Sequence, residues 1–267
     1  MIFGIGISSK EYRMKNVAYY HVYLDDFCTW AQIFAEQMDC FEKTGLFENI
    51  DTIKVTAISQ QDQRAEIFAN FCRLYPVRFE IEYIKNIHKN DYEMMENLSR
   101  IFDDVQFIGE NHTLSKMWND SKHEDFNILY FHLKGITATL NNLLVPGRIA
   151  KYKNRYDWRQ FMNWGTLKEW KFHVDALKEN DVSGVDFQEL PSKHFRGNFW
   201  WTKSSHVRQL PDPVPLEWWE ECKRKANDPW LDKVSARFRD EQWVCYKDGI
   251  KVSNIANNNG NYNFNDI

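Results

Sequence analysis

The first half of the chain alternates short apolar runs with amphipathic stretches. Residues 17–24 (VAYYHVYL), 53–58 (IKVTAI) and 78–84 (RFEIEYI) are rich in β-branched and aromatic side chains, which predicts three strands. The stretch that ends at a candidate helix cap, Gly45, and the stretch 61–74 space their apolar residues as helices do. This alternation predicts a parallel sheet whose strands are joined by crossover helices.

A nearly continuous apolar run at 127–135 (NILYFHLKG) predicts a buried central strand. In open parallel sheets a ligand binds beyond the carboxyl ends of the strands, so we expect His132, Lys134 and Gly135 to face the site. His132 and Lys134 are two residues apart and therefore project to the same side of the strand. The alternative is that His132 is a hydrogen-bonded core histidine and Lys134 a solvated strand end.

The second half of the chain has a mixed pattern. Residues 138–157 lack an apolar period and carry several cations, Arg148 among them, which predicts a mobile loop. Helical spacing returns over 158–179, and two strand-like segments follow at 184–188 and 196–203. A proline-rich loop and two tryptophan-containing helical stretches come next.

No internal repeat or convincing linker divides the sequence, so it predicts a single domain over residues 1–267. Its two halves span about 17–137 and about 138–250, and the Asn-rich segment 254–267 is expected to be frayed. The expected fold class is α/β, with a mainly parallel central sheet flanked by helices and a mixed second half.

Candidate chemistry in the second half begins with GNFWW at 197–201. Gly197 permits close approach of the backbone, and Asn198 offers both a donor and an acceptor. Alternation along a strand predicts that one of Trp200 and Trp201 is in the core while the other is exposed. The alternative is an aromatic core strand with a bulge at Gly197.

A second candidate segment, RFRDEQWV at 237–244, carries two adjacent carboxylates. Asp240 and Glu241 are flanked by Arg237 and Arg239, an arrangement that suits a general base with charge-paired neighbours. The alternative is the solvated start of a helix, because adjacent side chains on a helix do not face the same way.

Composition excludes several classes of function. With 34 Lys and Arg against 38 Asp and Glu, the formal charge of -4 gives no general attraction to nucleic acid or anionic membranes. The apolar run at the start is too short for a signal peptide and no segment reaches the length of a membrane span, so we expect a cytoplasmic protein. The five cysteines include no CxxC pair, which predicts reduced thiols rather than a disulfide framework or a zinc site. HExxH, GxSxG, GxxxxGK[ST] and GxGxxG motifs are absent from the sequence.

Taken in order, the motifs resemble a family of glycosyltransferase-like proteins, seen in bacteria and large DNA viruses, that have a GT-A type nucleotide-sugar fold. The resemblance covers residues 17 to 245 and rests on these segments: a first strand like VAYYHVYL, a Glu-x-x-Thr-Leu helix at 110–114, LYxHxKG at 129–135, WRxxM at 158–162, GNFWW at 197–201 with R-x-LP at 208–211, and an Arg-rich carboxylate helix at 237–243.

This resemblance implies transfer of a sugar from a nucleotide-sugar donor to an acceptor, such as a glycan. The nucleotide would bind to the first half and the acceptor to the second. The implied donor-binding residues are His132, Lys134, Gly135, Glu110, Thr113 and Arg148, and the implied acceptor-binding residues are Asn198, Trp200, Trp201 and Arg159. Asp240 or Glu241 would serve as the base for the acceptor hydroxyl.

Many GT-A enzymes hold a divalent metal ion with an Asp-x-Asp motif, but this sequence has none. Cleavage of the donor builds negative charge on the departing diphosphate, so a cation is needed there. Lys134, helped by Arg148 from the basic loop, would supply that charge without a metal. No metal ligands are assigned, and dependence on Mg²⁺ or Mn²⁺ stays open.

Two other classes of function compete with the transferase interpretation. A non-catalytic carbohydrate-binding or scaffold protein would use the same fold and tryptophans without transfer. A nucleic-acid-processing protein would use the basic loop, but that patch is short and the overall charge is acidic. We therefore expect a nucleotide sugar and a glycan or small-molecule acceptor as partners, with no nucleic acid and no integral membrane segment. The oligomeric state is not specified by the sequence.

Overall fold

The computed structural model describes residues 13–24, 27–59, 61–85, 109–133, 149–215, 217–229, 231 and 236–255, with the side chains of 27–28, 149–155 and 236–237 left aside. Within these residues, seven strands form one sheet in the order β3-β2-β1-β4-β8-β5-β9. The strands are β1 (Lys15–Tyr23), β2 (Thr52–Ser59), β3 (Phe79–Lys85), β4 (Phe126–His132), β5 (Val182–Val185), β8 (Trp200–Lys203) and β9 (Val252–Ile255). A small separate ladder joins β6 (Phe187–Gln188) to β7 (His194–Phe195).

The predicted parallel core of the sheet is confirmed. Strands β1, β2, β3 and β4 pair in parallel, whereas β8 pairs antiparallel with both β4 and β5. Strands from both halves of the chain therefore belong to one mixed sheet, and the fold is α/β. Because β2 and β3 lie on one side of β1 and β4 on the other, the strand order changes direction between β1 and β4. Open α/β sheets bind ligands beyond the strand ends at such a switch point.

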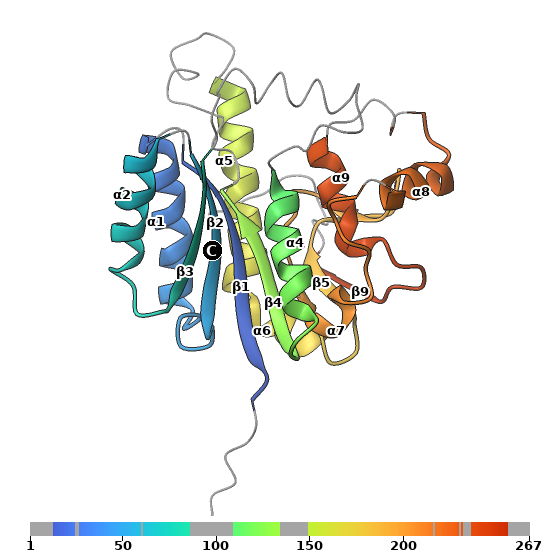
Figure 1. The fold of residues 1–267 in the computed structure, drawn as a ribbon, viewed down its shortest axis with the longest axis horizontal. Coiled ribbons are helices and arrows are strands. Elements are labelled where there is room, and N and C mark those ends of the chain that lie inside the picture. The colour runs from blue at the N-terminus through green and yellow to red at the C-terminus, as the bar shows by residue number, and fades with distance from the viewer. Residues whose placement is uncertain are drawn as a thin grey trace, which may run out of the picture.

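Helices cover both faces of the sheet (Figure 1). One face carries α1 (Phe27–Lys43), α2 (Asp62–Cys72) and α5 (Ile149–Asn163), and the other carries α4 (Glu110–Ser121), α7 (Ser204–Val207), α8 (Glu217–Ala226) and α9 (Ala236–Gln242). A π-helical turn (Trp164–Lys168) and α6 (Trp170–Ala176) follow α5, and a 3-10 turn (Trp243–Cys245) follows α9.

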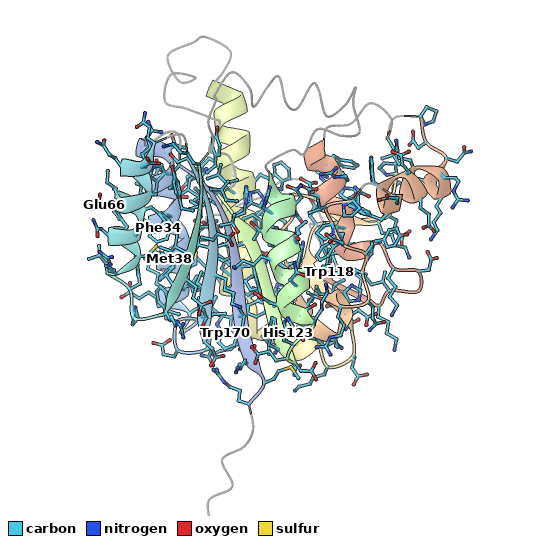
Figure 2. The ribbon with its side chains drawn as sticks, viewed as in Figure 1. Phe34, Met38, Glu66, Trp118, His123 and Trp170 are labelled. Carbon is cyan, nitrogen blue, oxygen red and sulfur yellow. The ribbon has the colours of Figure 1, made fainter. Side chains whose placement is uncertain are left out.

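Helix α1 shows why the first half was predictable. Trp30, Phe34, Met38 and Phe41 recur at helical spacing and are buried against the sheet, where Figure 2 labels Phe34 and Met38. Gly45 has φ 69°, a left-handed conformation that glycine adopts without strain, so the predicted cap is confirmed.

Three boundaries in the second half correct the predictions. The expected loop at 138–157 is wrong from Ile149 onward, where α5 begins; Ala, Lys and Arg favour a helix there without supplying an apolar period. The helix expected over 158–179 is interrupted by the π-helical turn, in which Gly165 packs so closely on Val185 that a Cβ would lie 2.7 Å from Val185 Cγ2. The tail expected to fray from 254 begins within β9, which pairs with β5 as far as Ile255.

The described residues contain no helix with both the length and the apolar character needed to cross a bilayer. Cys40, Cys72, Cys222 and Cys245 are buried free thiols.

Candidate functional site

A buried cluster of polar side chains lies at the β1/β4 switch point, under the N-terminal turn of α4. Glu110 is the first residue of α4 and is 6% exposed. Its Oε2 accepts a hydrogen bond of 2.8 Å from the Tyr130 hydroxyl of β4 and one of 2.6 Å from Asn198 Nδ2. Trp200 Nε1 donates to Asn198 Oδ1 at 2.7 Å. These contacts fix Glu110 and Asn198, because each uses polar atoms that would otherwise be buried without a partner.

His132 ends β4 and joins the same cluster. Its Nε2 lies 2.8 Å from the carbonyl oxygen of Gly197 and 3.9 Å from Glu110 Oε1. A carbonyl oxygen only accepts, so His132 Nε2 carries a proton and donates it to Gly197. Gly197 (φ 89°) and Asn198 (φ 57°) both have left-handed backbones, and this turn places the Gly197 carbonyl and the Asn198 amide beside His132 and Glu110.

Asp240 of α9 binds the start of α4 from the opposite side. It is 1% exposed; its Oδ2 accepts from the backbone N–H of Asn111 at 3.2 Å, and its Oδ1 accepts from Arg239 Nε at 3.2 Å. Burial raises the pKa of the Asp240 carboxyl to about 6; Arg239 opposes this shift and the negative charge of Glu110 adds to it. A carboxylate at this place also complements the positive end of the α4 dipole.

Two residues of the cluster were not assigned a role from the sequence. His21 of β1 pairs in register with His132, and its Nδ1 lies 3.0 Å from Thr113 Oγ1 of α4. In the apolar run VAYYHVYL, His21 carries no signal of a functional role. Its place at the switch point follows only from the register of β1 against β4. Arg239 appeared only as a charged neighbour of Asp240, yet its Nη2 is buried and finds no hydrogen-bond partner among the residues that the structure describes.

The structure thus brings together residues from separate predicted motifs: Glu110, Thr113, His132, Asn198 and Asp240. Glu241 lies next to Asp240 and is buried at 9% exposure. The prediction that Asp240 and Glu241 begin a helix needs correction, because they lie in the second half of α9, a helix that spans Ala236–Gln242. Lys134, Gly135 and Arg148 lie outside the described residues.

Of the other predicted acceptor residues, Trp200 bonds to Asn198 within the cluster, whereas Trp201 and Arg159 lie elsewhere. Trp200 and Trp201 do lie on opposite faces of the sheet, but both have 0% exposure, which corrects the expectation that one ring would be open for stacking. Trp201 Nε1 donates to the Thr166 carbonyl at 3.0 Å. Arg159, also buried, donates from Nε to Glu36 of α1 at 2.9 Å, on the face of the sheet opposite the cluster.

A metal site does not emerge from these side chains. Across the described ranges, no three His, Cys, Asp or Glu residues are grouped as ligands for an ion. Apart from Arg239 Nη2, the hydrogen-bonding atoms described above for the cluster bond to one another or to backbone groups, so the cluster forms a support at the strand ends.

Comparison with known proteins gives one family match. A model described as "Domain of unknown function (DUF8361)" matches residues 19–246. A search of curated proteins found no match. Among solved structures, the 4-diphosphocytidyl-2C-methyl-D-erythritol synthase from Anaerococcus prevotii DSM 20548 is similar at 9% identity and a TM-score of 0.41, over 93% of this chain and 91% of that chain. At this level the likeness carries no information on activity.

Proposed function

The chain belongs to the DUF8361 family, and we propose that it is a transferase that moves a sugar from a nucleotide-sugar donor to an acceptor hydroxyl. The observation that carries the proposal is the meeting of Glu110, His132 and Asn198 at the switch point of a parallel sheet. Three segments distant in sequence supply these residues, and all three belong to the motifs that resemble GT-A glycosyltransferases. A switch point is also where α/β sheets bind nucleotides.

Donor cleavage requires a cation beside the departing diphosphate. Arg239 supports this part of the proposal, because its Nε is held by Asp240 while its buried Nη2 has no partner within the described ranges. A planar guanidinium suits phosphate oxygens. Lys134 would provide a second positive charge by its position in the sequence, two residues after the last residue of β4. In this proposal Arg239 and Lys134 neutralise the negative charge of the departing diphosphate, and no step depends on a metal.

The acceptor hydroxyl must lose a proton to a base, and the two candidate carboxylates differ. Both oxygens of Asp240 are engaged, and its side chain is closed off from solvent. Asp240 is therefore better suited to position α4 and Arg239, and we assign the base to Glu241. In-line attack by the activated hydroxyl on the anomeric carbon would then invert its configuration.

Nucleotide binding provides the first test. Thermal unfolding should be followed with UDP, GDP, CDP and ADP and with UDP-glucose, UDP-N-acetylglucosamine and GDP-mannose. A ligand at one hundred times its Kd stabilises the folded state by about 2.7 kcal/mol, so a true donor raises the melting temperature clearly. Failure of every nucleotide and nucleotide sugar to raise it would refute the transferase, and stabilisation by free glycans alone would support the carbohydrate-binding alternative.

Arg239→Lys tests the assigned cation without removing its charge. Lysine keeps a bond to Asp240 but loses the second nitrogen of the fork, so affinity for the nucleoside diphosphate should fall roughly tenfold. Arg208→Lys is the matched control, because Arg208 pairs with the exposed Asp125 instead. Equal affinity of the two variants by calorimetric titration would remove Arg239 from the proposal.

A further inference from the structure

A groove of about 400 Å³ lies beside α4, on the α4 face of β2 and β3. Its volume falls within the range of small-molecule sites in proteins. The residues that line it come from β2, β3, α4 and the loop before α8: Thr56, Glu82, Ile84, His112, Ser115, Lys116, Asn119, Asp120 and Val214.

The groove lies next to the polar cluster in the register of the sheet. His132, His21, Thr56 and Glu82 are successive partners across β4, β1, β2 and β3. The first two belong to the cluster and the last two line the groove. The groove is therefore a distinct position, one strand away from the proposed donor site.

Two residues that line the groove each have a buried polar atom for which the described part of the chain supplies no hydrogen-bond partner. Thr56 is 1% exposed, yet its Oγ1 is unpaired, and the buried Nε2 of His112 is also unpaired. Buried polar groups in native proteins nearly always find partners, and each exception calls for an explanation. Both atoms belong to residues that line one groove, so a ligand that reaches them from the groove would give each a partner.

The charges around the groove cancel. Lys116 pairs with Glu82 at 3.0 Å, and Lys54 pairs with Asp120 at 2.7 Å. Burial lowers the pKa of His112, which keeps its imidazole neutral at neutral pH. The groove therefore offers no net charge to hold an ion and favours a neutral ligand.

The wall formed by Val214 is fixed in place before any ligand binds. Trp118 Nε1 donates to the carbonyl of Leu210 at 2.9 Å, and Trp243 Nε1 donates to the carbonyl of Pro211 at 2.9 Å. Figure 2 labels Trp118 on the side of α4 that faces the C-terminal elements. These two bonds anchor the loop, so the groove is pre-formed.

We propose that this groove binds a neutral, hydroxyl-rich molecule the size of one or two sugar rings, with Thr56 Oγ1 and His112 Nε2 as its direct partners. A sugar hydroxyl donates and accepts, as do the threonine, serine, asparagine and neutral histidine groups of the lining. Ile84 and Val214 supply apolar contacts for the C–H groups of a ring. The site does not depend on the proposed transferase activity.

The test is calorimetric or NMR titration of the full chain with D-glucose, D-galactose, N-acetyl-D-glucosamine and maltose. Thr56→Val preserves shape and removes only the hydroxyl, so affinity for the sugar that binds should fall roughly tenfold. Thr166→Val is the matched control, because Thr166 Oγ1 is also buried and unpaired but does not line the groove. This control should bind the sugar as the wild type does.

Four outcomes of the sugar titrations would overturn the proposal. They are failure of every sugar to bind, wild-type affinity in Thr56→Val, an equal loss in Thr166→Val, and much tighter binding of glucose 6-phosphate than of glucose. A loss of nucleoside diphosphate affinity in Thr56→Val would also overturn it, because the groove would then be part of the donor site. Sugar binding through Thr56 without any nucleotide binding would refute the transferase alone.

Discussion

Two polar regions lie side by side on the α4 face of the sheet, and they differ in how their hydrogen bonds are satisfied. In the cluster, Glu110 accepts two bonds and Asp240 accepts two. In the groove, Thr56 Oγ1 and His112 Nε2 have no partner in the described part of the chain. Apart from Arg239 Nη2, the hydrogen bonds of the cluster hold α4, α9 and the Gly197 turn together. These two atoms of the groove are left to bond with a ligand, which is why we place a ligand site there.

Removal of one carboxylate from each region should give the largest difference in the free energy of unfolding between the cluster and the groove. Glu110→Ala leaves the Tyr130 hydroxyl and the Asn198 amide without their shared acceptor in a buried site, and should lower the free energy of unfolding by about 3 to 5 kcal/mol. Relief of the repulsion between Glu110 and Asp240 offsets part of this loss. Urea unfolding measures the effect.

Glu82→Ala is the matched change in the groove. Its carboxylate pairs with Lys116 at the surface, with 53% of the Glu82 side chain exposed, so the loss should be below about 1 kcal/mol. Similar losses in the two variants would contradict the distinction between a structural cluster and an open groove.

Lys134→Ala tests the proposed catalytic cation separately from stability. If Lys134 stabilises the departing diphosphate, its removal should lower kcat and kcat/KM for donor hydrolysis about a hundredfold, or about 3 kcal/mol, with an unchanged melting temperature. Activity should survive a chelator. Loss of activity in chelator and its recovery with Mn²⁺ would show that a metal carries the charge instead.

Asp240 should give the cluster a pH dependence. Because its folded-state pKa of about 6 lies above the ordinary value of 3.8, the folded protein binds this proton more tightly than the unfolded chain does. The contribution of Asp240 to the free energy of unfolding therefore falls as pH rises from about 4 to about 6 and levels off above, by about 3 kcal/mol in total.

Asp240→Asn isolates this contribution, because the amide does not titrate. Urea unfolding of both proteins at pH 4.5 to 8 should show the wild type losing stability relative to the variant as pH rises to 6. A gain over the same range would mean that Arg239 and the α4 dipole outweigh burial and lower the pKa of Asp240.

Sequence reasoning succeeded where local pattern and burial agree. The parallel strands followed from apolar runs, and the strand-end position of His132 followed from the run that precedes it. Asn198 and Asp240 were found as polar residues inside apolar or charged motifs. Glu110 accepts a hydrogen bond from Asn198, and its negative charge acts on Asp240. Its role was predicted only through the family resemblance.

The remaining features depend on contacts distant in sequence, which a local pattern does not encode. His21 became visible through strand register, and Arg159 through its ion pair with Glu36 across two helices. The burial of Trp200 and Trp201 depends on layers packed against both faces of the sheet. The groove has no motif at all, because β2, β3, α4 and the loop before α8 each contribute part of its lining.

The smallest expected change in the free energy of unfolding comes from making the same substitution, Thr→Val, in each of the two regions. Thr113 and Thr56 are both buried, at 0% and 1% exposure. Among the described residues, the Thr113 hydroxyl has a partner, His21 Nδ1, and the Thr56 hydroxyl has none. Thr113→Val breaks that bond and should lower the free energy of unfolding by about 1 to 2 kcal/mol. Thr56→Val replaces an unsatisfied hydroxyl with a methyl group and should raise it, by up to about 1 kcal/mol.

The opposite signs make this pair informative despite its size, because removal of a buried hydroxyl costs stability where that hydroxyl has a partner and not where it has none. Urea unfolding without ligand measures both variants. If Thr56→Val is destabilised as much as Thr113→Val, the Thr56 hydroxyl already has a partner in the ligand-free protein, such as a bound water. The groove would then be another satisfied polar region, and its contrast with the cluster would disappear.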